Sequence, residues 1–360
     1  MKRKCKNVDI TDLGFICTAI DDCLRNKRKT RNDIIRFERD YPSTTAMALE
    51  MQEEIKNREL NLKPIWYKDK FDQASGKTRH IGIQDIKQQF YDYVVVNALV
   101  AGGLDKTIGA HQYASIKNRG QLKAAIKISK WLKGSNSRYY IKLDVKSYYK
   151  SIPHDMLMQY LRRTICNDDL LCLVEGLINT FDEGLAVGSY MSQFLANLYM
   201  SIIYHKIEEM HKIRHSRGKE IRQRLVFHHL IYMDDILIIG RNAKDLIKAA
   251  HEIENECADL GLTIKPGWAV EKITDTAFID MVGFRIYRDH ITVRRKNFKR
   301  LRRAYVRFAK RPKSVKLARR VVSFYGCLKH SDSQRFCHKY NVYRLTRRAR
   351  KVISRDCKIR

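Results

Sequence analysis

Two adjacent acids, Asp234 and Asp235, interrupt a run of large apolar residues that extends from 230 to 239. Such runs are typical of buried strands, and the two acids indicate the tight turn that joins them. A charge inside a protein is costly unless it is paired or bound to a cation. A second strand-like segment, 139–145, carries Asp144 near its end. A lone Asp-Asp pair more often marks a solvated turn, but converging carboxylates offer the oxygen ligands that Mg²⁺ prefers, so the three acids predict a divalent-cation site.

The residues around these acids resemble the motifs of reverse transcriptases. The sequence Tyr-Met-Asp-Asp at 232–235 resembles their catalytic turn, and the segment 142–152 resembles their first metal-binding motif. The resemblance extends from about Trp66 to about Tyr287, with the motifs in the order and spacing of the family. It implies an α+β right-hand polymerase with fingers, an antiparallel-sheet palm that carries helices on one side, and a short helical thumb.

The resemblance also assigns a reaction, the templated addition of a deoxynucleotide to a primer 3′-hydroxyl with two Mg²⁺ ions. Asp144 and Asp234 would ligate both ions with help from the Val145 carbonyl, and Asp235 would be a partial or indirect ligand. One ion lowers the pKa of the attacking hydroxyl, and the other neutralises the triphosphate. Lys265 fits the place of a lysine that protonates the leaving pyrophosphate, which contributes about 10²-fold or more. A surface lysine is the alternative.

Two further residues are expected at the nucleotide. Residues 65–83 predict a β-hairpin around the turn-rich stretch 72–76. By resemblance this is the fingers hairpin, and Arg79 is the arginine that grips the incoming triphosphate, because a guanidinium is always charged and forks onto phosphate oxygens. Tyr149 matches the aromatic residue that packs under the sugar and excludes a 2′-hydroxyl. An exposed strand arginine and a core tyrosine are the alternatives.

The segment 184–199 matches the motif that packs against the nucleotide and the templating base. Gly188 permits close backbone approach before a long helix begins. Most reverse transcriptases have Gln before this glycine, where this chain has Val187. Most also have Pro after the serine that corresponds to Ser192, where this chain has Gln193. The variant resembles reverse transcriptases of diversity-generating retroelements, which copy a template RNA with frequent errors at adenines into cDNA that rewrites a variable gene.

That resemblance implies a small basic accessory protein that assembles as a ring, in addition to template RNA, an RNA/DNA hybrid and deoxynucleotides. Val187 offers no side-chain hydrogen bond where other members offer an amide, and a lost contact of about 1 kcal/mol is roughly fivefold to tenfold in discrimination. Two alternatives remain. One is a group II intron-like or defence-associated reverse transcriptase, and the other is an RNA-binding scaffold with a vestigial polymerase site.

Other candidate contacts with nucleic acid lie outside the acid motifs. By resemblance, the loop 112–120 lies near the template, which makes Lys117 and Arg119 phosphate candidates, and Gly283 and Phe284 form part of a primer-grip turn. The segment 294–360 contains 25 lysines and arginines and two acids, a net charge of +23. Its helical patterns predict a thumb that holds the duplex, with these two basic residues among its contacts: Arg302 and Arg303.

The composition supports a nucleic-acid partner. The chain has 360 residues, is 44% hydrophobic and carries a net charge of +32, an excess that destabilises a fold through self-repulsion unless a polyanion binds. An acidic membrane surface is the rival, but no apolar run approaches the roughly 20 residues of a membrane span. The basic N-terminus lacks the apolar core of a signal peptide, and nine scattered cysteines indicate reduced thiols. We expect a cytoplasmic protein encoded by a bacterium, an archaeon or a phage.

We predict three domains: N-terminal helices and fingers over 1–138, the palm over 139–293 with a helical insertion at 156–183, and the thumb over 294–360. The helix after Gly188 is expected to extend past His211, with His215 one turn further on. That spacing can bind a metal, but a solvated or phosphate-facing role is the alternative because no carboxylate motif accompanies the histidines.

Overall fold

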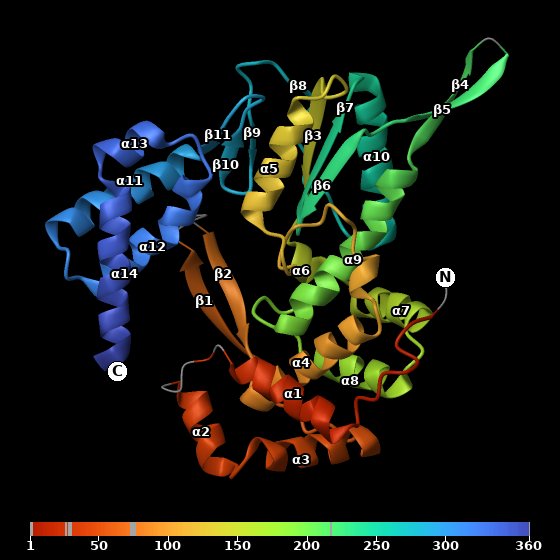
Figure 1. Cartoon of the computed structure of the whole chain (residues 1–360). Helices are drawn as coiled ribbons and strands as arrows, with labels where there is room; N and C mark the ends of the chain where they lie inside the picture. The colour runs from red at the N-terminus through yellow and green to blue at the C-terminus, as the bar shows by residue number, and fades with distance from the viewer. Residues whose placement is uncertain (1–2, 26, 28–30, 73–76, 217, 360) are drawn as a thin grey trace.

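The computed structural model describes residues 3–25, 27, 31–72, 77–216 and 218–359. Its centre is an antiparallel sheet with the strand order β6-β7-β3-β8 (Figure 1). The four strands are β3 (Tyr139–Asp144), β6 (His228–Tyr232), β7 (Asp235–Gly240) and β8 (Glu271–Lys272). The predicted antiparallel palm, and with it the α+β fold class, is confirmed.

Both faces of this sheet are covered. Ile141 and Ile238 point into a cluster shared with α9 (Tyr190–Glu209) and α10 (Ala243–Asp259). Residues of opposite parity, such as Tyr140 and Leu237, point into a second cluster, as the two-residue period of a strand requires. That second cluster includes residues of α5 (Gln121–Leu132) and of a small three-stranded sheet. The strands of the small sheet are β9 (Ile279–Met281), β10 (Phe284–Ile286) and β11 (Ile291–Val293).

The prediction of helices on one side of the palm was therefore wrong. Helix α5 carries an apolar stripe of Ala124, Ile128 and Leu132, and this stripe packs on the sheet face opposite to α9 and α10. A strand buried on both faces has no polar alternation, so the sequence of β7 offered no exposed side.

The fingers are a hairpin raised on a helical base (Figure 1). Strands β1 (Trp66–Asp72) and β2 (Lys77–Ile83) pair antiparallel as predicted, and the turn residues 73–76 lie outside the described part. Asp85 and Gln88 form a capping box that starts α4 (Ile86–Ala101). Helix α4 packs against α1 (Leu13–Leu24), α2 (Asn32–Asp40) and α8 (Asp168–Ile178). Helix α3 (Thr44–Asn57) packs against α1 and α8, and α7 (His154–Thr164) packs against α8.

Residues 211–224 differ from the expectation. Helix α9 ends at Glu209, and the chain forms a protruding hairpin of β4 (His211–Ser216) and β5 (Lys219–Arg224). The prediction of His211 and His215 one helical turn apart was therefore wrong. In β4 the two histidines lie four residues apart along an extended strand, which removes the spacing that suggested a metal site.

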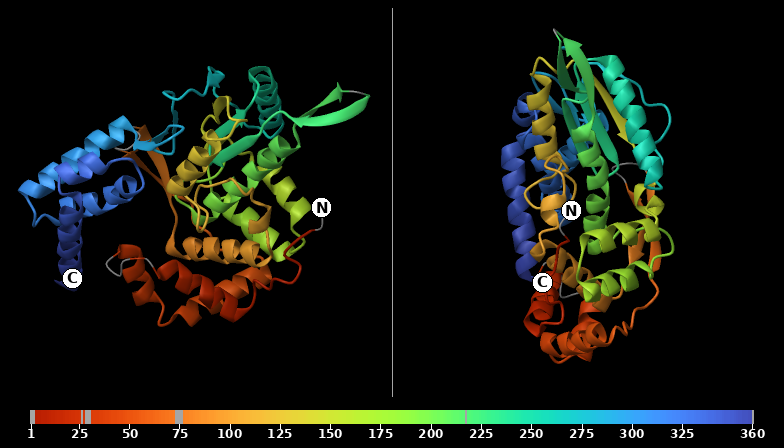
Figure 2. Two further views of the ribbon diagram at one scale, coloured as in Figure 1. Left: turned by 45° about the horizontal axis from the view of Figure 1, so that its top comes forward. Right: turned by 90° about the vertical axis from the view of Figure 1, so that its right-hand side faces the viewer.

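The C-terminal region forms a helical unit with its own core. Its helices are α11 (Arg295–Lys310), α12 (Val315–Lys329), α13 (Gln334–Lys339) and α14 (Val342–Ile359). Leu301, Tyr305 and Phe308 of α11 are fully buried in this core, and Phe298 packs against both it and the palm. Figure 2 shows the unit on the side of the palm opposite to the β4–β5 hairpin. The described helices include none that is long and apolar enough to cross a bilayer.

Candidate active site

The register of the palm sheet brings the three acids together. Asp144 at the end of β3 stands directly opposite Asp235 at the start of β7, so their side chains share one face. Asp234 lies in the two-residue turn between β6 and β7, where Met233 adopts a left-handed conformation with φ of 58°. The Val145 amide donates to the Asp234 carbonyl at 3.0 Å, which ties the turn to the end of β3.

Burial and mutual repulsion act on these carboxylates. The pKa of Asp235 is raised to about 6, first by burial and then by the charge of Asp234. Burial also raises the pKa of Asp234, and the nearby charge of Asp144 adds to the shift. Partly desolvated acids that repel one another are the arrangement that a bound cation would stabilise.

Lys265 supplies a positive charge in contact with Asp144. Its Nζ forms an ion pair with Oδ1 of Asp144, and its backbone amide donates to the Asp144 carbonyl at 2.8 Å. Both side chains remain about 40% exposed. The ammonium therefore stands at the carboxylate to which the resemblance assigns Mg²⁺, with solvent access that would let it move away.

The donor set fits Mg²⁺ held jointly by protein and substrate. Among the residues that the structure describes, no group of three or more His, Cys, Asp or Glu side chains is placed to hold a metal ion by itself. Mg²⁺ is commonly bound by one or two carboxylates together with substrate phosphates rather than by an all-protein cage. Asp144, Asp234 and the backbone carbonyl of Val145 at one sheet edge suit that mode of binding.

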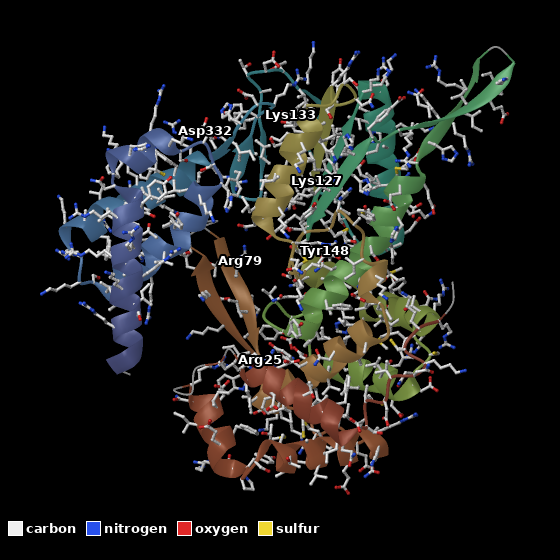
Figure 3. The ribbon with its side chains drawn as sticks, in the orientation of Figure 1. Arg25, Arg79, Lys127, Lys133, Tyr148 and Asp332 are labelled. Carbon is white, nitrogen blue, oxygen red and sulfur yellow. The ribbon has the colours of Figure 1, made fainter. Side chains whose placement is uncertain are left out.

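A cavity of about 770 Å³ opens beside the acids. The structure brings the predicted nucleotide-binding residues together around it with Asp234; they are Arg79, Tyr149, Val187, Gly188 and Gln193. Figure 3 shows Arg79 on the fingers hairpin and Tyr148 across from it near the palm. The Tyr149 hydroxyl contacts Met233 Sδ at 3.7 Å, and burial followed by the charge of Asp234 raises the pKa of this phenol. The cavity is therefore lined by a cationic side chain (Arg79), an aromatic side chain (Tyr149) and an acid (Asp234).

Gly188 is required where fingers and palm meet. Its φ is 126°, and a Cβ there would lie 2.7 Å from the carbonyl oxygen of Gly82. The Gly82 amide donates to the Val187 carbonyl at 2.9 Å. Strand β2 therefore rests on the Val187-Gly188 backbone, and a side chain at position 188 would push the two apart.

Sequence reasoning missed Asp92. This residue of α4 is 1% exposed, and its Oδ2 accepts hydrogen bonds from Ser189 Oγ at 2.7 Å and the Tyr190 amide at 2.9 Å. Burial raises its pKa to about 6, and the bond from Ser189 opposes that shift. The available signal was an acid within the apolar run 90–96, because a buried carboxylate needs partners from elsewhere in the chain.

Lys117 and Arg119, the two expected template contacts, differ in whether their side chains are already held by hydrogen bonds. The Arg119 guanidinium donates to the carbonyls of Gly109 and Gln112 at 2.6 and 2.7 Å, so it holds its own loop together. Lys117 is exposed on the same loop. Of the two, Lys117 is the side chain that a phosphate can reach without breaking internal hydrogen bonds.

The primer-grip candidates occupy a tight hairpin. Val282 and Gly283, with φ of 48° and 86°, form the two-residue turn between β9 and β10. Phe284 is 3% exposed in the palm core, so its backbone, rather than its ring, is available to a primer. Arg302 and Arg303 are exposed on α11 and line a shallow hollow on that helix.

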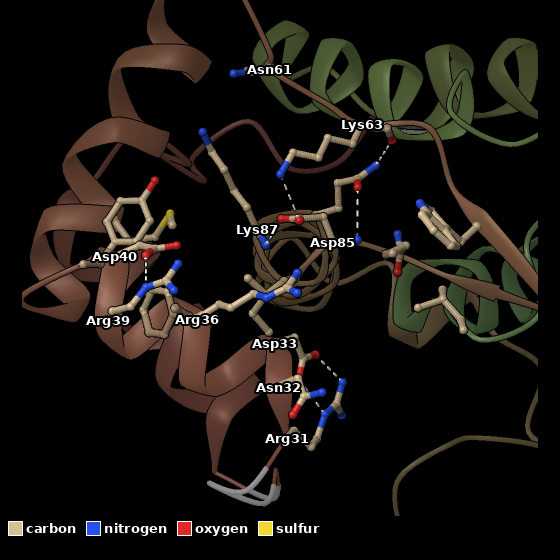
Figure 4. A pocket seen from close by; sticks show the side chains of 18 of the residues that line it. Arg31, Asn32, Asp33, Arg36, Arg39, Asp40, Asn61, Lys63, Asp85 and Lys87 are labelled. Atoms are coloured by element: carbon tan, nitrogen blue, oxygen red, sulfur yellow. Dashed lines mark hydrogen bonds and ion pairs between the residues drawn. The ribbon is translucent and has the colours of Figure 1, made fainter.

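A larger cavity of about 1200 Å³ lies under the fingers, between α2, α3 and the start of α4 (Figure 4). Its charges are largely compensated by one another. The ion pairs are Arg31–Asp33, Arg39–Asp40, Lys63–Asp85 and Lys87–Glu50. Because its acids are paired with its own cations, the larger cavity offers no converging free carboxylates among the described residues. We therefore assign the chemistry to the smaller cavity, which Asp234 lines.

The antiparallel palm, the paired acids and the cavity between fingers and palm define a right-hand polymerase. Residues 68–286, more than half of the chain, match the family described as "Reverse transcriptase (RNA-dependent DNA polymerase)". The chain belongs to this family. It is also 24% identical over 169 residues to the putative COX1/OXI3 intron 1 protein of Saccharomyces cerevisiae. That match covers 44% of this chain and 19% of the yeast protein, so the chain spans about a fifth of that relative's length.

Proposed function

We propose that the protein is an RNA-directed DNA polymerase that adds deoxynucleotides to a primer 3′-hydroxyl along an RNA template. The observation that carries this proposal is the meeting of Asp144, Asp234 and Asp235 at one edge of the sheet, beside a cavity lined by Arg79 and Tyr149. Membership in the reverse transcriptase family supports it. The absence of a membrane-spanning helix from the described residues is compatible with the cytoplasmic location that we propose.

In this proposal Asp144, Asp234 and the Val145 carbonyl would hold two Mg²⁺ ions, with Asp235 as a partial or indirect ligand. When bound, they lower the pKa of the attacking hydroxyl and neutralise charge on the triphosphate. Asp235 also faces Asp144 across the strand pair, and the charge of Asp144 helps to raise the pKa of Asp235. The carboxylates need no rearrangement of the sheet for this task, because the strand register already fixes them.

The other side chains bind, orient and protonate. Arg79 clamps the triphosphate from the fingers side, and the partly buried Tyr149 fills the space that a 2′-hydroxyl would enter. Lys265 holds a proton at Nζ beside Asp144 and is placed to deliver it to the departing pyrophosphate.

Primer extension on an RNA template tests the proposal. The wild-type chain with Mg²⁺ and deoxynucleotides should yield cDNA, whereas Asp234→Ala should abolish synthesis and leave RNA affinity unchanged. Residual synthesis by Asp234→Ala would refute the assignment of this acid. A wild-type chain that binds RNA but never extends a primer would favour the RNA-binding scaffold with a vestigial site.

We further propose that the polymerase belongs to a diversity-generating retroelement, makes cDNA with errors at template adenines, and works with a small basic accessory protein that forms a ring. Val187 supports this, because the side chain on the cavity wall has no hydrogen-bonding group with which to check a base pair. Sequencing the cDNA should reveal errors concentrated at adenines, and Val187→Gln should lower their frequency roughly fivefold to tenfold.

The competing candidate is a group II intron-like reverse transcriptase without a mutagenic role. The similarity to a yeast intron protein favours it. Accurate cDNA from every template base, unchanged by Val187→Gln, would decide for this alternative and remove Val187 from any account of fidelity.

A further inference from the structure

The β4–β5 hairpin projects from the palm on the side away from the thumb (Figures 1 and 2). Its base is anchored: Lys212 Nζ forms an ion pair with Asp245 of α10 at 2.6 Å, and the Leu225 amide donates to the Met210 carbonyl at 3.1 Å. Beyond this base, the described side chains from Ile213 to Arg222 are exposed on both faces of the ribbon. The hairpin therefore adds no core to the palm.

Charge is concentrated on this ribbon. Residues 211–224 contain six lysines and arginines and one acid. Four of the basic side chains are exposed and have no ion pair within the described part of the chain: Arg214, Lys219, Arg222 and Arg224. The register places the first two on one face and the last two on the other. Ile213 and Ile221, about half exposed, lie between the cations on opposite faces.

Such a ribbon is complementary to a polyanion. Uncompensated like charges on a two-stranded ribbon repel one another and weaken it, and phosphates remove that repulsion. Cations on both faces suit a folded RNA that wraps the ribbon better than a flat lipid surface, which would meet one face. A basic partner protein would be repelled.

We propose that the β4–β5 hairpin is a second RNA-binding surface, which holds a folded part of the template RNA outside the active-site cavity. The identity of the RNA as template rests on the proposed function. Attachment at two points makes the second contact intramolecular and raises the affinity for long RNA without a new contact at the cavity. A short primed hybrid that occupies only the space between fingers and thumb gains nothing from the hairpin.

The test uses the full chain with four substitutions, Arg214→Gln, Lys219→Gln, Arg222→Gln and Arg224→Gln. Affinity for a long folded RNA should fall at least about tenfold, and the slope of log K against log salt should shrink by about 3, as expected for four lost phosphate contacts. Extension of a short primed RNA template should stay unchanged, which separates this inference from the proposed polymerase activity. The matched control removes four exposed charges elsewhere: Lys6→Gln, Lys56→Gln, Lys106→Gln and Arg163→Gln.

Equal losses in the hairpin variant and the control variant would overturn the inference, because overall charge would then explain binding. Unchanged RNA affinity in the hairpin variant would overturn it as well. Loss of binding to vesicles of anionic phospholipid, with RNA affinity retained, would make the hairpin a membrane contact instead.

A second, independent inference concerns Asp92. Its Oδ2 also accepts from the Met191 amide at 3.3 Å, so one oxygen receives three donors from the first turn of α9. Its Oδ1 accepts from Gln84 Nε2 at 3.1 Å. An ionised carboxylate at a helix N-terminus complements both the unpaired amides and the helix dipole.

This contact fixes the cavity wall. Val187 and Gly188 directly precede the turn that Asp92 holds, and Gly82 binds them from the other side. Both anchors belong to the fingers, on α4 and β2. We infer that Asp92 is a positioning residue, which sets the place of Val187-Gly188 against the incoming nucleotide.

Asp92→Asn tests this role, because the amide keeps the shape but replaces a charged acceptor with a neutral group that carries donors. The KM for deoxynucleotide should rise about tenfold or more with a smaller change in kcat, since a misplaced cavity wall weakens nucleotide binding. Gln84→Ala is the matched control, because among the described residues Gln84 gives Asp92 its one hydrogen bond from outside α9 and its N-cap. It should lower Tm without changing KM.

Equal loss of Tm in both variants with unchanged KM would reduce Asp92 to a core polar residue and overturn the inference. If Asp92→Asn fails to fold, Ser189→Ala removes one donor and should still raise KM; an unchanged KM there would overturn it too. Wild-type extension, measured in parallel, reports on the proposed function separately.

Discussion

The sheet edge with Asp144, Asp234 and Asp235, here called the palm edge, and the thumb differ in the sign and the arrangement of their charges. At the palm edge, three acids are held close by strand register, partly buried and raised in pKa. The thumb segment, 294–360, carries a net charge of +23, and its basic side chains surround a separate apolar core. The acids of the palm edge can act only if their positions are fixed relative to one another. The thumb cations need only a high density of positive charge to bind nucleic acid. Substitutions at the palm edge should therefore abolish chemistry, and those in the thumb should weaken binding by degrees.

The largest effect is expected from Asp144→Asn. The substitution keeps the side-chain shape and removes the charge opposite Asp235, so cation binding and primer extension should be lost. Tm should change little, because relief of the repulsion from Asp235 is offset by loss of the half-exposed ion pair with Lys265. Primer extension and thermal unfolding measure the two effects. A variant that still extends primers would show that the Asp144 carboxylate, although it lies opposite Asp235, is not needed to hold the cation.

Tyr149→Ala should open the space beneath the sugar. Ribonucleotide incorporation relative to deoxynucleotide should rise about 10-fold to 100-fold, because the discrimination is steric. Competition between the two nucleotides in single-turnover extension gives the ratio. No change in that ratio, with normal deoxynucleotide use, would leave Tyr149 as a packing residue only.

Gly188→Ala should cost about 1 to 3 kcal/mol of folding stability, since φ of 126° is unfavourable for alanine and its Cβ would meet the Gly82 carbonyl. The KM for deoxynucleotide should rise as the fingers shift away from the palm. Denaturant unfolding and steady-state kinetics test this. Gly326→Ala is the control, because Gly326 lies within α12 with nothing near its missing Cβ, and that change should be neutral or stabilising.

The smallest effect is expected in the thumb. Arg302→Gln with Arg303→Gln should weaken binding of an RNA/DNA hybrid and reduce its salt slope by about 1.5 to 2, with kcat at saturating hybrid unchanged. Binding isotherms at several salt concentrations measure this. A large loss of kcat would show that these side chains act on geometry rather than on charge density, and the contrast with the palm would fail.

Local signals in the sequence predicted the elements that position the site. The hairpin predicted over 65–83 is observed as β1 and β2, and the long helix predicted after Gly188 is observed as α9. Both depend on strand alternation, turn residues and helix-start signals, which act within a few residues. The convergence of Asp144 with the Asp234-Asp235 turn was expected from strand ends placed by similarity to a known order of motifs, whereas the register that sets Asp144 opposite Asp235 is seen only in the structure.

Long-range and two-sided features were not predictable in this way. Asp92 meets Ser189 across 97 positions, and no local pattern announces such a contact. The ribbon 211–224 is exposed on both faces, so it lacks the apolar alternation that marks a half-buried strand, and no Gly or Pro marks the end of α9 before it. Phe284 was named for its place in a turn, but its ring lies in the core.

A structure of the chain with a primed RNA template, an unreactive deoxynucleotide analogue and Mn²⁺ in place of Mg²⁺ tests the central claim most directly. We expect anomalous density for metal between the carboxylates of Asp144 and Asp234 and the triphosphate, with Lys265 Nζ released from Asp144. Metal bound elsewhere, or a triphosphate seated away from these acids with Lys265 still paired to Asp144, would contradict it.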